Sequence, residues 1–86
     1  MKLLSDRDTF VRVQAIYTLG ELKATKAVPE LVKMLRDDEQ MIREESLNAL
    51  TEITGQAIKF DVNNKSEREK GIKRWDDWVA KNKDAL

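Results

Sequence analysis

Apolar residues recur along much of the chain at the three- and four-residue spacing of amphipathic helices. One set comprises Val11, Ala15, Leu19 and Leu22, with Arg12 and Ile16 alongside. A second set with the same spacing comprises Ile42, Ser46, Leu50 and Ile53. Each set predicts a longer helix with one buried face, because residues at these intervals form one stripe along a helix.

The two predicted helices are copies within an internal repeat. When the chain is shifted by 31 residues, apolar positions superimpose on apolar positions, and several identical residues coincide. The superimposed pairs are Leu4 with Leu35, Asp6 with Asp37, Asp8 with Glu39, Val11 with Ile42, Arg12 with Arg43, Ile16 with Leu47, Leu19 with Leu50, Glu21 with Glu52 and Leu22 with Ile53. Repeats of this length are typical of stacked helical units.

A shorter helix is predicted between the two copies, over about residues 27–36. Pro29 suits its first turn, where the missing N–H costs nothing. Its apolar stripe consists of Val28, Leu31, Val32 and Leu35. The repeat unit is therefore a helical hairpin, in which this helix turns into the longer one at about 39–54, and Met1–Leu4 is the stub of an earlier short helix.

Acidic residues and glycines mark the predicted helix ends. Carboxylates that can cap free N–H groups precede both longer helices, as Asp6 and Asp8 in the first copy and as Asp37 and Asp38 in the second. Gly20 and Gly55 lie near or just past the helix ends, although Gly20 also suits a position where two helices pack closely.

The last segment predicts one more helix with an apolar face. Ser66 and Glu69 form a capping box at its start. The residues on its apolar face are Ile72, Trp75, Trp78 and Val79. We expect the two tryptophans to cover the apolar side of the last hairpin, and the alternative is an aromatic binding surface.

The length and composition predict one all-α domain. A chain of 86 residues rarely holds two hydrophobic cores. Sixteen basic and sixteen acidic residues cancel, so no overall field draws the chain to nucleic acid or to a membrane surface. No run of apolar residues approaches the length of a signal-peptide core or a membrane span, and a cytoplasmic location is the default expectation.

The residue types present do not favour an enzyme or a cofactor protein. Cysteine and histidine are both absent, which removes thiol nucleophiles, the commonest general base and the commonest metal ligands. The acidic run Asp37-Asp38-Glu39 is explained by helix capping, and adjacent Glu44 and Glu45 point about 100° apart on a helix. We therefore expect no catalytic residue, no metal site and no cofactor.

The motifs of the second copy resemble a known family of repeats. They are Ala27-Val28-Pro29-Glu30-Leu31, Asp37-Asp38, Ile42-Arg43, Ala49-Leu50 and Ile53-Thr54-Gly55. Over about residues 4–55 the chain resembles the short HEAT-like repeats named after phycobilisome lyases. Thr51 stands where that family favours glycine and Ser46 where it favours alanine, which suggests an end repeat.

The resemblance implies an α-solenoid of HEAT-like helical hairpins with a C-terminal capping helix. Its parts would be a partial first repeat at 1–24, a second repeat at 25–55, and a loop and capping helix at 56–86. It also implies that Arg12 and Arg43 join a ladder of ion pairs with aspartates between neighbouring repeats. The alternative for the two arginines is a phosphate site.

The exposed side of the two longer helices is the predicted protein-binding surface. Its residues are Val13, Gln14, Tyr17, Glu21, Glu44, Glu45, Asn48 and Glu52. An aromatic ring among carboxylates suits a basic peptide or protein segment, and the alternative is ordinary solvent-facing surface. The predicted function is non-catalytic protein–protein interaction, as a scaffold or as the end of a longer solenoid.

Three further possibilities stay open from the sequence. The resemblance implies an accessory subunit of a cofactor-attaching, bilin lyase-like enzyme. The last segment contains basic residues that could touch nucleic-acid backbones, although interleaved carboxylates disfavour this; they are Lys65, Arg68, Lys70, Lys73, Arg74, Lys81 and Lys83. Apolar groups near Leu3, Leu4 and Phe10 lack a preceding hairpin, so self-association through an open N-terminal end is possible.

Overall fold

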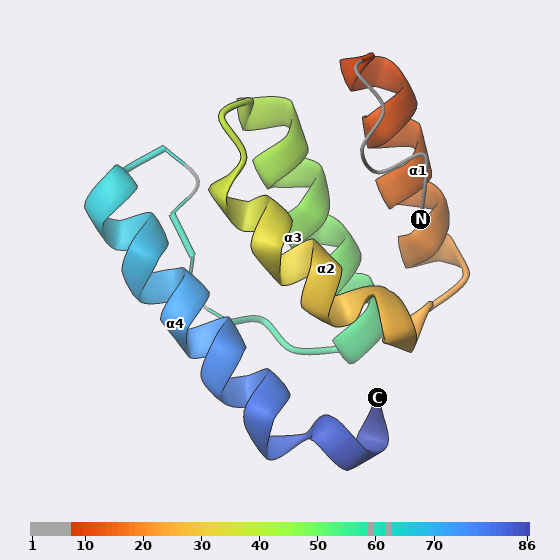
Figure 1. Cartoon of the computed structure of the whole chain (residues 1–86), viewed down its shortest axis with the longest axis vertical. Helices are drawn as coiled ribbons and strands as arrows, with labels where there is room; N and C mark the ends of the chain where they lie inside the picture. Colours follow the sequence, from red (N-terminus) through yellow and green to blue (C-terminus); the bar gives the residue numbers. More distant parts are fainter. Residues whose placement is uncertain (1–7, 59, 62) are drawn as a thin grey trace.

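The computed structural model describes residues 8–58, 60–61 and 63–86, and its regular structure over these residues is entirely helical (Figure 1). The helices are α1 (Thr9–Glu21), α2 (Val28–Lys33), α3 (Gln40–Thr54) and α4 (Lys65–Lys81), with 3₁₀ turns η2 (Thr25–Ala27), η3 (Met34–Arg36) and η4 (Lys83–Ala85). This confirms the all-α prediction. The predicted helix stub at Met1–Leu4 and the cap at Asp6 lie outside the described residues.

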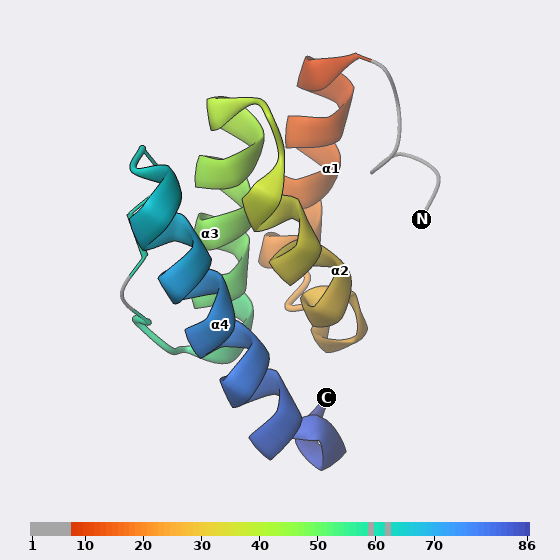
Figure 2. The ribbon, with the colours of Figure 1, turned by 60° about the vertical axis from the view of Figure 1, so that its left-hand side comes forward.

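The helices are arranged so that the two copies of the longer helix are neighbours. α1 and α3 pack against each other and run in the same direction, while α2 and η3 pack on α3 and run the opposite way (Figures 1 and 2). This is the arrangement that the repeat predicts. The short helix predicted at 27–36 corresponds to η2, α2 and η3 in succession, with Pro29 in the first turn of α2.

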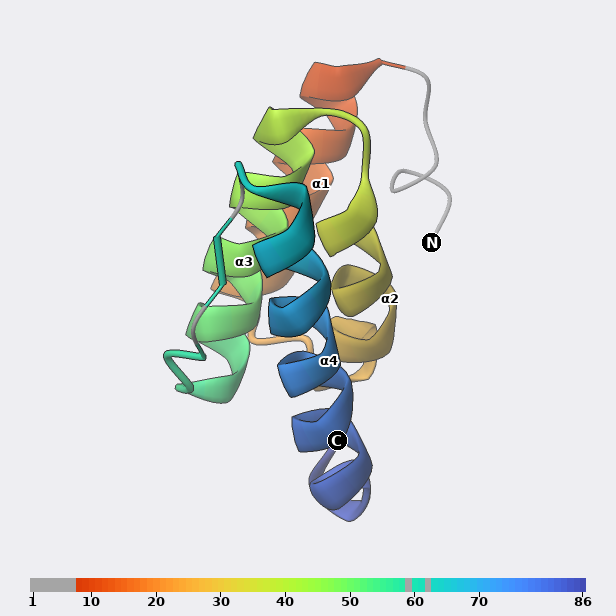
Figure 3. The same cartoon turned by 90° about the vertical axis from the view of Figure 1, so that its left-hand side faces the viewer.

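α4 departs from the direction of the repeat. It packs against α2 and η3, but the segment after Gly55 first returns along the length of α3, so α4 runs opposite to α2 (Figure 3). Ile58 and Phe60 of this segment pack against the core. A third hairpin in the same pattern would place its first helix parallel to α2, so α4 is not a copy of α2.

The start of α1 confirms the predicted cap at Asp8, and its end shows that Gly20 does not terminate the helix. The Asp8 carboxylate accepts a hydrogen bond from the Phe10 N–H at 2.9 Å, as a helix N-cap does. At the other end Lys23, with φ 49°, takes the left-handed conformation, and the Ala24 N–H donates to the Leu19 carbonyl at 3.0 Å. Gly20 lies inside α1 and does not end it.

Two of the predicted caps are wrong. The N-cap of α3 is Glu39, without a side-chain cap, and Asp37 accepts the Glu39 N–H at 2.9 Å from outside the helix. The N-cap of α4 is Asn64, which accepts from the Glu67 N–H at 3.1 Å. Ser66 lies within α4 because α4 begins at Lys65, directly after Asn64 and two residues earlier than a cap at Ser66 requires.

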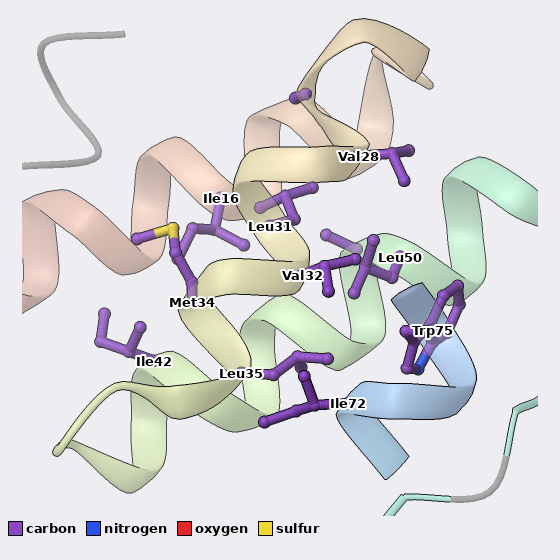
Figure 4. Packing of buried hydrophobic residues seen from close by; sticks show 12 residues of the cluster. Ile16, Val28, Leu31, Val32, Met34, Leu35, Ile42, Leu50, Ile72 and Trp75 are labelled. Atoms are coloured by element: carbon purple, nitrogen blue, oxygen red, sulfur yellow. The ribbon is translucent and has the colours of Figure 1, made fainter. Parts of the chain in front are cut away.

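The core joins α2, η3 and α3 with one face of α4 and a single large residue from α1 (Figure 4). In α3 the predicted stripe is confirmed, since Ile42, Ser46 and Leu50 are fully buried. In α1 the predicted stripe is confirmed in part, since Ala15 and Leu19 are half-buried and pack against the core, but Ile16 beside them is the fully buried residue and Leu22 is 72% exposed. The buried face of α1 is turned by about one residue, or about 100°, toward α3.

Trp75 supplies the largest buried side chain of α4. It is fully buried, and Figure 4 shows it pointing toward Leu50 of α3. Trp78 is half-buried and meets Trp75 edge-on, with ring centroids 6.2 Å apart. The Trp75 Nε1 has no hydrogen-bond partner, so this indole contributes apolar packing and no polar contact. The prediction that the tryptophans cover apolar surface is confirmed for Trp75.

Candidate functional site

Two arginines at equivalent positions make different contacts, Arg12 between the repeats and Arg43 within the second one. The Arg12 guanidinium of the first copy forms an ion pair with the Asp37 carboxylate of the second. Arg43 is buried and donates from one Nη1 to the Asp37 and Asp38 carbonyls, at 2.8 and 3.0 Å. The predicted pairing between neighbouring repeats is thus confirmed for Arg12. Both guanidiniums bind oxygen atoms of the protein itself, so no bound phosphate is needed to explain the two arginines.

A groove of about 500 Å³ lies on the outer side of α1 and α3. Its lining residues come from both helices and from the turn after α1: Tyr17, Gly20, Glu21, Lys23, Glu45, Asn48, Ala49 and Glu52. At its base Gly20 faces Ala49 so closely that a Cβ on Gly20 would lie 3.2 Å from the Ala49 Cα. The absent side chain therefore lets the two helix backbones approach each other beneath the groove.

The groove brings together five of the eight residues of the predicted surface. They are Tyr17, Glu21, Glu45, Asn48 and Glu52. Gln14 and Glu44 are exposed but do not line it, and Glu44 accepts a hydrogen bond from the Gln40 side chain at 2.7 Å. Val13 was expected on the exposed side, but it is half-buried and packs against the core, because the buried face of α1 is turned toward α3.

Sequence reasoning missed three lining residues, Gly20, Lys23 and Ala49. Gly20 and Ala49 carry a signal that could have found them, since two small residues on adjacent parallel helices mark a close approach. Lys23 carries a weaker signal, because it follows the helix and its position depends on the left-handed turn. Its Nζ lies 3.7 Å from a Glu52 carboxylate oxygen and 3.3 Å from the Glu52 carbonyl oxygen.

Negative charge surrounds the aromatic ring of the groove. Tyr17 is 50% exposed. Its hydroxyl donates a hydrogen bond to the Glu21 carboxylate, which together with the charge of Glu21 raises the pKa of Tyr17 above its usual value of 10.0. The charges of Glu45 and Glu52 raise this pKa further. Carboxylates from both helices therefore act on the one phenol.

Carboxylates of α4 pair with one basic side chain of α4 and with one of η3. Lys70 lies 3.3 Å from Glu67, and the Arg36 guanidinium of η3 lies 3.2 Å from Glu69.

Over residues 8–58, 60–61 and 63–86, no cluster of acidic side chains is placed to hold a metal ion. Within the same ranges no helix is long and apolar enough to span a bilayer.

Comparisons with known proteins agree with the helical hairpins. The family described as HEAT repeats matches residues 1–60, which is more than half of the chain. Searches of curated proteins and of solved structures find no match. HEAT repeats generally mediate protein–protein interaction or scaffolding and are typically non-catalytic. By this match, and with its helices packed as the repeat predicts, the chain belongs to the HEAT repeat family.

Proposed function

We propose that this chain is a non-catalytic protein-interaction module whose recognition surface is the groove between α1 and α3. The observation that carries the proposal is the composition of the groove. It combines a half-exposed aromatic ring with charged side chains, in a concavity built by two rigid helices. Aromatic residues in such settings are the usual anchors of protein interfaces.

A matched pair of variants tests the recognition surface. Tyr17 and Phe10 are both exposed aromatic residues of α1, but only Tyr17 lines the groove. The wild-type chain, Tyr17→Ala and Phe10→Ala would each be immobilised and exposed to an extract of the source cells, and the captured proteins would be quantified. We expect a set of proteins that Tyr17→Ala loses and Phe10→Ala retains. Equal capture by both variants would reject the groove as the recognition surface.

We also propose that α4 is the C-terminal cap of a HEAT-like solenoid whose repeats are of the phycobilisome lyase type. Its direction opposite to α2 and the full burial of Trp75 support this role. Trp75→Ala is expected to remove about 3–5 kcal/mol of unfolding free energy, a large share of the total for a short chain. Chemical denaturation followed by circular dichroism would measure it, and a loss below about 1 kcal/mol contradicts the capping role.

No feature of the described residues favours an accessory role beside a bilin lyase-like enzyme or binding to nucleic acid over protein recognition. A cytoplasmic location and self-association through the N-terminal end also stay predictions. The single-domain division of the chain likewise stays a prediction.

A further inference from the structure

The charge of the groove is the starting point for identifying its partner. Three carboxylates and one ammonium line it, namely those of Glu21, Glu45, Glu52 and Lys23, so the lining carries a net charge of −2. The whole chain has a formal net charge of zero. The groove is therefore a local concentration of negative charge on a chain that is otherwise balanced, and it attracts cations.

Lys23 shows how the groove already accommodates a cation at one end. Its ammonium lies near the carboxylate and the carbonyl oxygen of Glu52, at 3.7 and 3.3 Å. Toward the other end, no basic side chain of the described residues forms an ion pair with Glu45 or Glu21. Lys23 thus compensates part of the charge and leaves the carboxylates next to Tyr17 without a cation.

The ring of Tyr17 completes a site for a flat or extended cation. A guanidinium or ammonium placed over a tyrosine face is attracted by the ring, and adjacent carboxylates add charge-assisted hydrogen bonds. Glu21 lies close enough to Tyr17 for its carboxylate to act on the hydroxyl by a hydrogen bond and by charge. Resting on the proposed function, we infer that the groove recognises a basic segment of a partner protein by binding an arginine or lysine side chain over Tyr17, between Glu21 and Glu45.

A peptide pair tests the chemistry of the partner. The probe is a short fluorescein-labelled peptide in which arginine alternates with alanine, and the control peptide carries glutamine in place of arginine. Fluorescence anisotropy at low salt is expected to show binding of the arginine peptide and at least about fivefold weaker binding of the glutamine peptide. Equal affinities for the two peptides overturn the inference.

Two lysine variants decide whether the groove is the site of binding. Lys23 and Lys33 are both exposed and both pair with a glutamate, but only Lys23 lines the groove. Lys23→Gln is expected to tighten binding of the arginine peptide about two- to fivefold, whereas Lys33→Gln leaves it unchanged. This is a gain of affinity, which partial unfolding cannot imitate. Equal effects of the two substitutions would place the peptide elsewhere and overturn the inference.

Tyr17 provides a spectroscopic readout because it is the only tyrosine of the chain. Arginine stays protonated well above pH 10, so the peptide keeps its charge while Tyr17 titrates. A cation over the ring favours the phenolate, and the arginine peptide is therefore expected to lower the pKa of Tyr17 in an absorbance titration. An unchanged titration with the peptide bound overturns the inference.

Failure of this inference is distinguishable from failure of the proposed function. If Tyr17-dependent proteins are captured while the arginine peptide binds no better than its glutamine control, the groove is a recognition surface for a partner of other chemistry, and the inference alone fails. If capture is equal for Tyr17→Ala and Phe10→Ala, and the peptide pair also shows no difference, both fail.

Discussion

α1 and α3 are the equivalent helices of the two copies of the repeat, yet they are buried to different extents. α3 packs against α1 on one side and against α2 and η3 on another, and its residues Ile42 and Leu50 are fully buried. The equivalent residues of α1, Val11 and Leu19, are only half-buried. The same apolar pattern therefore produces a core in one copy and a partly exposed face in the other.

The difference shows that a HEAT helix has two packing faces. One face meets the short helix of its own hairpin, and the other meets the equivalent helix of the next hairpin. α1 uses the second face, centred on Ile16 and Gly20, whereas α3 uses the first face against α2 and packs its opposite side, at Ala49, against α1. Thr51, the equivalent of Gly20, is exposed, since no further helix packs on that side of α3 within the described residues.

The largest expected effect comes from two leucines at equivalent positions. Leu50→Ala removes fully buried methyl groups and is expected to lower the free energy of unfolding by about 2–5 kcal/mol. Leu19→Ala removes a half-buried side chain and is expected to cost roughly 1 kcal/mol. Urea denaturation of both variants would measure the contrast. Similar losses would mean that α1 and α3 are equally supported, contrary to the packing described above.

The two equivalent arginines give the next contrast. Arg43→Met leaves the Asp37 and Asp38 carbonyls without their donor and is expected to cost about 1.5–3 kcal/mol. Arg12→Met breaks an ion pair that water partly reaches, and the expected cost is about 1 kcal/mol. Thermal unfolding of the two variants would rank them. A larger loss for Arg12→Met would show that the contact between repeats outweighs the turn inside the second one.

The third contrast is between Gly20 and Thr51, which are equivalent positions where substitution by alanine is expected to change stability in opposite directions. Alanine is the better helix former at both, by up to about 1 kcal/mol. At Gly20, however, the added Cβ would press on the Ala49 backbone, at a cost of about 1–3 kcal/mol, so Gly20→Ala is expected to destabilise by roughly 1 kcal/mol. Thr51→Ala meets no neighbouring helix and is expected to stabilise by about 0.5 kcal/mol. Stabilisation by Gly20→Ala would disprove the close approach of α1 and α3.

These contrasts also define what the sequence could predict. The 31-residue repeat and its periodicity predicted the helices, their order and the parallel packing of α1 and α3, because these follow from local spacing and from similarity between the copies. The buried face of α1 was not predictable from its own pattern. Val11 and Ile16 are both apolar, and which of them is buried depends on the helices that surround α1.

The groove was predictable in part for a related reason. Tyr17, Glu21, Glu45, Asn48 and Glu52 lie on the polar sides of two helices that the repeat made neighbours, so sequence reasoning placed them together. Lys23 depends on a left-handed turn that residue type alone does not indicate, since glycine is the usual residue there. The cap at Asn64 was missed because Ser66 and Glu69 offered an equally good capping pattern two residues later.

The smallest expected effect distinguishes the two equivalent glutamates of the groove. Glu21 raises the pKa of Tyr17 by accepting its hydrogen bond and by its charge, whereas Glu52 acts by charge alone. Glu21→Gln should therefore move the appearance of tyrosinate to lower pH by more than Glu52→Gln does, because replacing the charged acceptor of the hydroxyl by a weaker, neutral one favours the phenolate. Absorbance titration of the single tyrosine would measure both shifts. If Glu52→Gln shifted the titration more, the hydroxyl of Tyr17 would be directed at α3, and the cation-binding geometry inferred for the groove would have to be redrawn around Glu52.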